Sequence, residues 1–427
     1  MKRYSRLACL AMGASVLGLA GCGGGGGGGS GAAATDPAPA PTSGSGSMST
    51  STQSGYSVTN LVSDQAGMAL VQDPNLVDAW GISFAPGQAV WVADNGTNKS
   101  TLYDGNGVIN SLVVTIPPGA NNPNNLPGAN PTGIVFNPTT GFGIGPSGST
   151  TPAAFIFVGE DGTISGWAQG TAAFTAVDNS ATAVYKGVGL YAPSSGPSLL
   201  FAADFATGKV DVFNSSFQPT TVANGFVDPN LPAGYAPFNV QVLNNMVFVA
   251  YAQQKSGQTA PIINEQDGAG LGFVDEFDPT GKFIQRFDAP GGNLNAPWGL
   301  TIAPASFGAL SGDLLVGNFG DGTISAYNLS TGAYVGKLTN TSGAPVVLPG
   351  LWGIAFGNGV DNQPTTTLFF AAGPSAEAHG LYGRIDLPGT YTPASSAGSS
   401  TSTTPTSSTP PSSTPPSSTP PSSPTGY

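Results

Sequence analysis

The sequence predicts an all-β fold: a six-bladed β-propeller of four-stranded antiparallel blades, with disordered segments at both ends. Three observations lead to this prediction. A short phrase recurs six times at intervals of about 50–60 residues, an apolar run follows each copy, and turn-forming pairs separate the runs. The 427 residues include 63 Gly and 38 Pro but are only 8% charged, and this composition without a helical period favours short strands.

The recurring phrase predicts the innermost strand of each blade. It consists of a small or aromatic residue, then Gly, then alternating apolar residues. It occurs at 80–84, 132–136, 298–302 and 352–356, with weaker copies at 187–190 and 238–242. Innermost strands crowd around the propeller axis, where Gly allows neighbouring backbones to approach. We therefore expect these six segments to line the axis.

The segments that follow each phrase predict the second, third and fourth strands. Apolar runs typical of strands buried on both faces occur at 90–94, 155–160, 200–204, 247–251, 314–318 and 368–372. Asp161-Gly162 and Asp321-Gly322 then provide hairpin turns ahead of an amphipathic strand. A fourth strand follows after another turn, so each repeat corresponds to one blade.

The last repeat ends at Leu387, one strand short of a full blade. The stretch 56–62 precedes the first repeat, and we predict that it provides the missing outermost strand and closes the ring. The propeller then spans residues 56–390. An open β-solenoid is the alternative fold, but its repeats are shorter than these.

The N-terminus predicts a signal peptide over residues 1–21. Lys2, Arg3 and Arg6 precede an apolar stretch at 7–20. This stretch is too short to cross a hydrocarbon core of about 30 Å, and it is typical of a secretory signal.

A lipid anchor is predicted directly after the signal. Leu19-Ala20-Gly21-Cys22 resembles the lipobox of bacterial lipoproteins, which implies that the Cys22 thiol is acylated with diacylglycerol and that Cys22 becomes the first residue after cleavage. We therefore expect a cell-envelope protein held to a membrane by its lipid. Gly23 after the cysteine favours the outer membrane over the inner one. The alternative is an ordinary secretory signal, with Cys22 a spare thiol.

Low-complexity segments flank the propeller region. Residues 22–55 are rich in Gly, Ala, Pro and Ser, which predicts a flexible linker. Residues 391–427 are almost entirely Ser, Thr and Pro, with Thr-Pro-Pro-Ser-Ser repeated. Such a tail cannot bury a core, so we expect it to be disordered, and its glycosylation is left open.

One repeat carries a family resemblance. Val90-Trp91-Val92-Ala93-Asp94, followed by Thr101-Leu102-Tyr103, resembles an NHL-type repeat. The whole span 56–390 is similar to a family of uncharacterised bacterial propeller proteins. The resemblance implies the fold but no activity, because propellers carry many unrelated functions.

Charge and rare residues exclude several classes of function. The net charge of −12 argues against a nucleic-acid partner, because phosphate binding requires clustered Lys and Arg. Two Cys exclude a disulfide scaffold, and a single His excludes a multi-His metal centre. That histidine, His379, lies in a turn before the last strand, where we expect a structural role.

We expect the propeller to be monomeric.

A ligand site is predicted at one mouth of the central channel. In a propeller, the loop that enters the first strand and the loop between the second and third strands lie on the same face. The residues at these positions combine aromatic rings, which suit sugars, with oxygen ligands, which suit Ca²⁺. They are Trp80, Asp94, Glu160, Asp204, Phe238, Asn239, Trp298, Asn318 and Trp352. The alternative is structural, because Asp commonly caps turns and Trp commonly packs between blades.

Two long segments are expected to overhang the same face. The longest insertion, 253–272, belongs to the fourth blade and carries Glu265 and Asp267. The Asn-rich segment 117–131 enters the second blade. Loops of this length in a compact fold are often functional, so this face is the predicted working face.

Three functions remain open on these grounds. We favour a noncatalytic binding module for a glycan, peptide or protein, because of the anchor, the aromatic mouth and the scarcity of catalytic residues. The second function is a Ca²⁺-dependent hydrolase that resembles six-bladed lactonases. Its metal candidates are Asp94, Glu160 and Asp204, with Asn239 and Asn318 as further ligands. The third is a passive component of the envelope.

Overall fold

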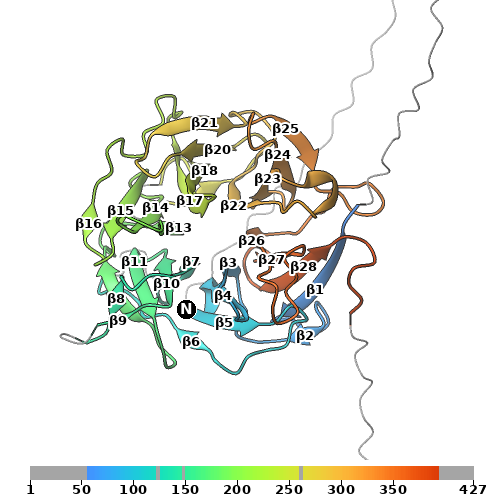
Figure 1. Ribbon diagram of the computed structural model, residues 1–427, viewed down its shortest axis with the longest axis horizontal. Helices are drawn as coiled ribbons and strands as arrows, with labels where there is room; N and C mark the ends of the chain where they lie inside the picture. The colour runs from blue at the N-terminus through green and yellow to red at the C-terminus, as the bar shows by residue number, and fades with distance from the viewer. Residues whose placement is uncertain (1–54, 122–125, 147–149, 259–262, 394–427) are drawn as a thin grey trace, which may run out of the picture. The chain divides into compact units, whose positions relative to one another are not determined.

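Six antiparallel sheets are arranged in a ring around a central axis (Figure 1). The computed structural model describes residues 55–121, 126–146, 150–258 and 263–393. The signal peptide (1–21), Cys22, all of the linker except Gly55 and the tail beyond residue 393 lie outside the described residues. The innermost strands are β3 (Ala79–Phe84), β7 (Pro131–Phe136), β13 (Tyr185–Tyr191), β17 (Tyr235–Leu243), β22 (Pro297–Ile302) and β26 (Leu351–Phe356). These contain the six repeated phrases, so the predicted all-β, six-bladed propeller is confirmed.

The first three blades each have four strands in outward order. Blade 1 continues from β3 with β4 (Val90–Asp94), β5 (Lys99–Tyr103) and β6 (Val114–Thr115). Blade 2 continues from β7 with β10 (Phe155–Gly159), β11 (Thr163–Trp167) and β12 (Phe174–Asp178). A small hairpin, β8 (Gly143–Ile144) and β9 (Thr151–Pro152), follows β7. Blade 3 continues from β13 with β14 (Leu199–Asp204), β15 (Lys209–Asn214) and β16 (Pro219–Thr220).

The next two blades follow the same order. Blade 4 continues from β17 with β18 (Met246–Gln254), β20 (Gly272–Phe277) and β21 (Phe283–Phe287), and β19 (Glu265–Gln266) pairs with the end of β18. Blade 5 continues from β22 with β23 (Leu314–Asn318), β24 (Ile324–Tyr327) and β25 (Tyr334–Lys337). Two short 3₁₀ turns, η1 (Asn95–Thr97) and η2 (Gly308–Leu310), connect strands. None of the helices found in the described ranges is long and apolar enough to cross a bilayer.

Blade 6 joins the two ends of the propeller. It contains β26, β27 (Leu368–Ala372) and β28 (Leu381–Asp386), and its fourth strand is β1 (Ser57–Ser63), with β2 (Val71–Gln72) beside it. β1 pairs antiparallel with β28 from Ser57↔Asp386 to Ser63↔Leu381. Figure 1 shows the N-terminal strand in blue beside the C-terminal strand in red. The predicted closure of the ring by the segment 56–62 is therefore confirmed.

The closing strand is also fixed to the neighbouring blade. Tyr56 is buried, its hydroxyl donates to the carbonyl oxygen of Phe307 at 2.6 Å, and its ring stacks on Phe307 with centroids 4.6 Å apart. Its backbone also forms a bridge with Asn340. This contact between blades 5 and 6 lies outside the β1–β28 ladder and adds to the closure.

Glycines set how closely the innermost strands approach one another. A Cβ atom on Gly81 would lie 2.6 Å from the carbonyl oxygen of Thr132, and one on Gly353 would lie 2.5 Å from that of Trp80. Gly133, Gly187 and Gly299 are similarly crowded against the next blade. At the sixth position, Asn239 instead donates its Nδ2 hydrogen to the carbonyl oxygen of Trp298 at 2.7 Å. The expected close approach at the axis is therefore confirmed in five blades and replaced by an amide hydrogen bond in one.

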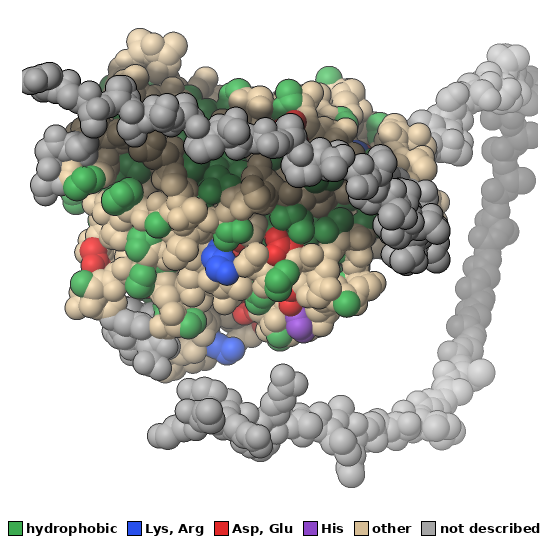
Figure 2. Space-filling view, turned by 90° about the horizontal axis from the view of Figure 1, so that it is seen from below, with side chains coloured by type: hydrophobic (Ala, Val, Ile, Leu, Met, Phe, Trp, Pro, Cys, Tyr) green, Lys and Arg blue, Asp and Glu red, His purple; other side chains and the backbone are tan. Residues whose placement is uncertain are grey.

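The core lies between successive blades. The second strands β4, β10, β23 and β27 are buried along their whole length, as their apolar runs predict. Trp91 of β4 stacks on Phe155 of β10 with ring centroids 4.3 Å apart, so the core of one blade continues into the next. Figure 2 shows only a few scattered charged side chains on the outer face that it presents.

We predict that the Tyr56 contact makes a large contribution to closure. Tyr56→Ala should lower the free energy of unfolding by about 3 kcal/mol, because a buried ring is lost, and Tyr56→Phe by about 1 kcal/mol, because the Phe307 carbonyl loses its donor. Urea unfolding of the full chain measures both. Val58→Ala, at a 38% exposed position of the same strand, is the matched control and should cost far less. Equal effects of Tyr56→Ala and Val58→Ala would contradict the prediction.

Candidate functional site

The two mouths of the central channel differ in chemistry. One holds a pocket of about 380 Å³ at the start of the innermost strands, which we call the acidic pocket. Its lining residues are Asp78, Trp80, Asn95, Leu126, Glu160, Lys186, Lys255, Asn264, Glu265, Asp267, Phe319 and Glu377. Five of these are carboxylates and two are lysines, so three negative charges are in excess when all are ionised.

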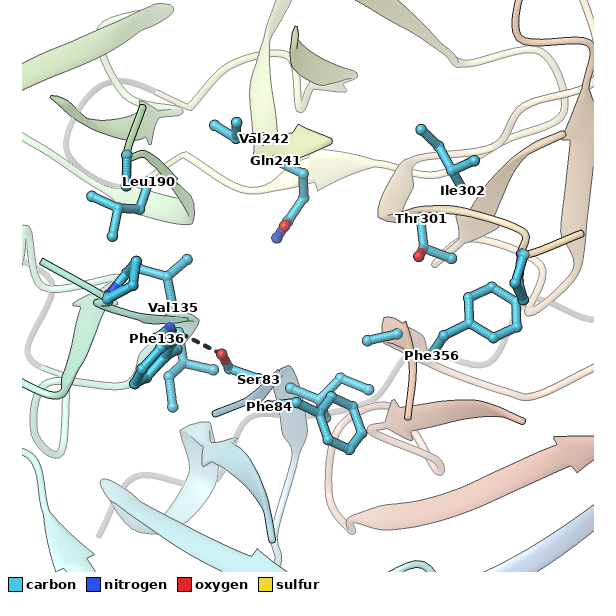
Figure 3. A pocket seen from close by; sticks show the side chains of 16 residues that line it. Ser83, Phe84, Val135, Phe136, Leu190, Gln241, Val242, Thr301, Ile302 and Phe356 are labelled. Atoms are coloured by element: carbon cyan, nitrogen blue, oxygen red, sulfur yellow. Dashed lines mark hydrogen bonds between the residues drawn. The ribbon is translucent and has the colours of Figure 1, made fainter. Parts of the chain in front are cut away.

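The opposite mouth is a funnel of about 480 Å³ at the far ends of the same strands (Figure 3). Its described lining carries no charged side chain. Apolar groups such as Phe84, Phe136 and Phe356 surround it, and the amide of Gln241 reaches toward its centre. Ser83 is already engaged, because its hydroxyl accepts the backbone N–H of Phe136 at 3.0 Å.

A cluster of rings lies on the axis between the two mouths. Trp80 stacks on Trp352 with centroids 3.5 Å apart, and Phe319 stacks on Trp352 at 4.0 Å. Trp298 meets Trp80 and Trp352 nearly at right angles, and Phe238 lies 5.7 Å from Trp352. We call these five residues the aromatic plug. Because they come from blades 1, 4, 5 and 6 and touch one another, they fill the axis and form the floor of the acidic pocket.

The position of the plug follows from the register of the innermost strands. The residue before each axial glycine or asparagine is Trp80, Thr132, Lys186, Phe238, Trp298 and Trp352 in blades 1 to 6. Four of these six are aromatic and belong to the plug, and Lys186 takes the equivalent place in blade 3. The N–H of the Trp298 indole donates to the backbone carbonyl of Lys186 at 2.9 Å, which connects blades 5 and 3 across the axis.

Lys186 is a buried cation held by carboxylates and rings. Its side chain is 2% exposed, and its Nζ lies 2.5 Å from Oε1 of Glu160 and 3.4 Å from Oε2 of Glu265. The ammonium also lies 5.1 Å from the centroid of Trp80 and 5.9 Å from that of Phe238, which are cation–π distances. Burial alone would lower the pKa of Lys186, but the two glutamates outweigh it and raise that pKa above its usual value. Lys186 is therefore charged at neutral pH.

Glu160 is the predicted mouth residue that the structure places in this network. Its Oε2 accepts a hydrogen bond from Nδ2 of Asn95 at 3.1 Å, while Oε1 faces Lys186. Asn95 in turn exchanges hydrogen bonds with Asn130, whose Nδ2 donates to Oδ1 of Asn95 at 2.9 Å. Glu160 is thus positioned from blades 1, 2 and 3 together.

Two further carboxyls, on Asp78 and Glu377, carry no compensating ion pair within the described part of the chain. Asp78 is 5% exposed, and its Oδ1 has no hydrogen-bond partner there. Burial raises the pKa of Asp78 well above its usual value, with repulsion from Glu377 and Glu160 adding to it, while the indoles of Trp80 and Trp352 act in the opposite direction. Burial, together with repulsion from Glu265, also raises the pKa of Glu377 to about 7.

The loop that holds Glu377 has an uncommon backbone. Ser375, Ala376 and Glu377 have φ values of 61°, 55° and 65°, so three consecutive residues with a Cβ are left-handed. Each such residue costs on the order of 1 kcal/mol. The β27–β28 loop therefore keeps Glu377 at the pocket against a local backbone preference.

Three of the predicted mouth residues lie inside the blades instead. Asp94, Asp204 and Asn318 end their strands at equivalent positions and are almost fully buried. Asp204 accepts hydrogen bonds from the backbone of Val184 and Ala206, and Asn318 accepts one from the backbone of Asn295. Asp94 accepts one from the hydroxyl of Thr101 at 3.2 Å. The structural alternative fits these three residues, and the pocket is lined by the next residue along, such as Asn95, Glu160 or Phe319.

The remaining predicted residues are structural parts of the floor. Trp80, Trp298, Trp352 and Phe238 are at most 2% exposed, so their rings support the pocket, and of these four only Trp80 lines it. Asn239 is buried at the axis. In the described ranges, no group of three or more His, Cys, Asp or Glu side chains is arranged to hold a metal ion.

The two overhanging segments reach the predicted face. Lys255, Asn264, Glu265 and Asp267 of the 253–272 insertion line the acidic pocket, as does Leu126 of the 117–131 segment. The working face proposed from loop length is therefore the face of the acidic pocket. His379 lies outside the pocket lining, with its Nδ1 2.7 Å from Oδ2 of Asp64, which agrees with a structural role in its turn.

Asp78, Lys186 and Glu377 were not predicted from the sequence. The signal for Lys186 was available, because aligning Tyr185-Lys186-Gly187 with Ala79-Trp80-Gly81 places the lysine at an axial position. Asp78 lies just ahead of the first phrase. Glu377 reaches the pocket from a loop of unusual conformation that no pattern in the sequence indicates.

The comparisons with known proteins give relatives in sequence and in structure. No protein-family model matches the chain. The chain is 31% identical over 342 residues to Uncharacterized protein R648 of Acanthamoeba polyphaga mimivirus, covering 77% of this chain and 80% of that protein. It is 29% identical over 342 residues to Uncharacterized protein L690 of the same virus, covering 77% and 85%.

Solved structures are more distant in sequence. A protein of unknown function from Bacteroides thetaiotaomicron has a TM-score of 0.48 and 11% identity, over 78% of this chain and 73% of that one. A streptogramin B lyase has a TM-score of 0.44 and 11% identity, over 78% of this chain and 99% of that one.

The pKa of Glu377 predicts how stability depends on pH. The folded pKa of about 7 lies above the ordinary value of 4.5, so the folded chain keeps a proton that the unfolded chain releases. This contribution is complete below the ordinary value and is lost as pH rises through about 7. Glu377→Gln should therefore gain up to about 3 kcal/mol relative to wild type as the pH is raised across that interval.

Urea unfolding of both proteins over a pH series measures this effect. Asp361→Asn, a change at an exposed residue, is the control and should run parallel to wild type. If the stability of Glu377→Gln also ran parallel to wild type, Glu377 would not hold the extra proton.

Proposed function

The chain belongs to the propeller family of the mimivirus protein R648, and we propose that it is a lipid-anchored, noncatalytic binding module of the cell envelope. In this proposal its ligand, a glycan, peptide or protein, enters the acidic pocket. The observation that carries the proposal is the pocket itself, a charged recess with a solid aromatic floor.

The shape of the pocket supports binding from one face. The aromatic plug fills the axis, so a ligand that enters the pocket reaches a floor, not a passage. The 253–272 insertion adds four lining residues, which makes the pocket deeper on the side of blade 4. Pockets with an aromatic surface and a few converging polar groups are typical ligand sites.

The chemistry of the lining supports recognition. The polar groups that the pocket presents are carboxylates, amides and ammonium groups, and its described lining includes no Ser, Thr, Cys or His. Carboxylates and amides accept and donate hydrogen bonds to hydroxyl and amine groups of a ligand. Phe319, which is only partly buried, offers a ring to an apolar part of the ligand.

A pair of blocking variants tests where the ligand binds. Asn264→Trp adds a bulky ring at the exposed rim of the acidic pocket, and Ala192→Trp adds one at the opposite mouth. Glycan and peptide arrays probed with the mature protein should give hits that Asn264→Trp weakens at least about tenfold and Ala192→Trp leaves unchanged. Hits lost only with Ala192→Trp would move the site to the funnel. An absence of hits with any of the three folded proteins would oppose a binding function.

The proposal of a lipid anchor is based on the first 22 residues of the sequence. The positive start, the apolar stretch and Leu19-Ala20-Gly21-Cys22 support acylation of Cys22. In a Gram-negative host, wild type should sediment with membranes, and Cys22→Ala should move to the soluble fraction or remain unprocessed.

Cys9→Ala is the matched control for the anchor. Cys9 lies within the segment that the signal peptide would remove, so its replacement should change nothing. Mass spectrometry of the mature N-terminus should show acyl chains in wild type and in Cys9→Ala only. A mature wild-type N-terminus that carries no acyl chains would contradict the anchor.

A further inference from the structure

We propose that the acidic pocket binds an alkylammonium group, the group carried by a lysine side chain or by a free diamine. This inference rests on the proposed function of the same pocket and names the chemistry of its ligand. It is carried by the unbalanced charge of the pocket, by the environment of Lys186 and by one buried carboxylate oxygen without a partner.

The charges of the pocket are not balanced within the described chain. Asp78, Glu160, Glu265, Asp267 and Glu377 face Lys186 and Lys255 across about 380 Å³. Lys186 is shared by Glu160 and Glu265, so it does not neutralise both of them. Asp78 and Glu377 make no ion pair with the described residues. Burying a carboxylate without a partner is unfavourable, and a cation in the pocket would relieve that cost.

Asp78 is an independent observation that points to a ligand. It lines the pocket, it is 5% exposed, and its Oδ1 accepts no hydrogen bond from the described residues. Buried polar atoms in folded proteins nearly always have a partner. An ammonium group carries three donors and can serve Asp78 and Glu377 together.

Lys186 shows which kind of cation this environment stabilises. Its ammonium lies against Glu160 and Glu265 and within cation–π distance of two rings of the plug. A second ammonium beside Asp78 and Glu377 would meet the same surroundings, with carboxylates around the charge and the ring of Phe319 available to its apolar stem. A neutral sugar would not lower the cost of ionising Asp78 and Glu377.

Binding should be linked to proton release from the pocket. Burial raises the pKa of Glu377 to about 7, with repulsion from Glu265 and Glu160 adding to it and attraction to Lys186 opposing it. The pKa of Asp78 is raised as well, partly by Glu377, and a cation beside the two carboxyls would lower both pKa values. An alkylammonium ion stays protonated to about pH 10, so the ligand itself does not titrate near neutrality. His379, in the same loop, faces Asp64 and not the pocket, and it remains unchanged in the variants below.

The test uses the mature wild-type protein and defined probes. 1,5-Diaminopentane represents the free diamine and Nα-acetyl-lysine-N-methylamide the lysine side chain. 1-Pentanol and Nα-acetyl-norleucine-N-methylamide are their uncharged counterparts, and CaCl₂ tests a metal cation. Titration calorimetry in two buffers of different ionisation enthalpy measures affinity and protons released.

We expect one or both amines to bind and the uncharged probes not to bind. Affinity should rise roughly fivefold from below to above the Glu377 pKa of about 7, with protons released at the lower pH. Glu377→Gln should weaken binding of the amines at least about fivefold and reduce that proton release, since Asp78 still holds a releasable proton. Asp78→Asn should weaken amine binding similarly, and Asp361→Asn should change neither quantity. Which amine binds tells the two sources of the group apart.

Three outcomes would overturn the inference. The first is that the amines and the uncharged probes bind equally well. The second is that Ca²⁺ displaces the amines and binds more tightly than either of them. The third is that neither amine binds to folded wild type at about 10 mM. The arrays could also give a ligand that lacks a cationic group. If Asn264→Trp blocked its binding and the amines did not displace it, the proposed function would stand and this inference would fail. Loss of amine binding in Asn264→Trp supports the inference even where the arrays give no hits.

Discussion

The close approach of six innermost strands at the axis is the constraint on which the rest of the structure depends. In five blades a Cβ-free residue lets the backbone lie close against the next blade, and in the sixth Asn239 spans the gap with a hydrogen bond. Because the strands are this close, the residue before each axial position lies at the axis itself. The plug, the buried lysine and the floor of the pocket all follow from that one geometric condition.

The same constraint explains why Lys186 determines the electrostatics of the pocket. At an axial position the side chain is enclosed by rings from other blades, so a charged residue there must bring its own partners. Glu160 and Glu265 supply them from blade 2 and from the insertion of blade 4. Further carboxyls reach the pocket from the loops before β3 and after β27, and no described cation pairs with them. The pocket is therefore an electrostatically incomplete assembly built on a rigid apolar base.

A shift of one residue separates the predicted site from the observed one. Asp94, Asp204 and Asn318 were expected at the mouth because they end apolar strands. Their side chains turn into the hairpin that follows, where they accept hydrogen bonds from backbone N–H groups or hydroxyls, although Oδ2 of Asp94 has no partner among the described residues. Glu160 reaches the mouth because it stands one place later, after Gly159. Strand alternation makes such a shift decisive, since successive side chains point in opposite directions.

The sequence by itself determined the number of blades, the strands of each blade, the N-terminal strand that closes the ring and the face overhung by long loops. These follow from local periodicity, turn chemistry and repetition, which are readable without knowing which segments meet in space. Only the tertiary structure decided that Asp78, Glu160, Lys186, Glu265 and Glu377 share one pocket. They come from five separate parts of the chain, and Glu377 depends on a left-handed turn, so their proximity arises from ring closure and loop conformation, which no local pattern encodes.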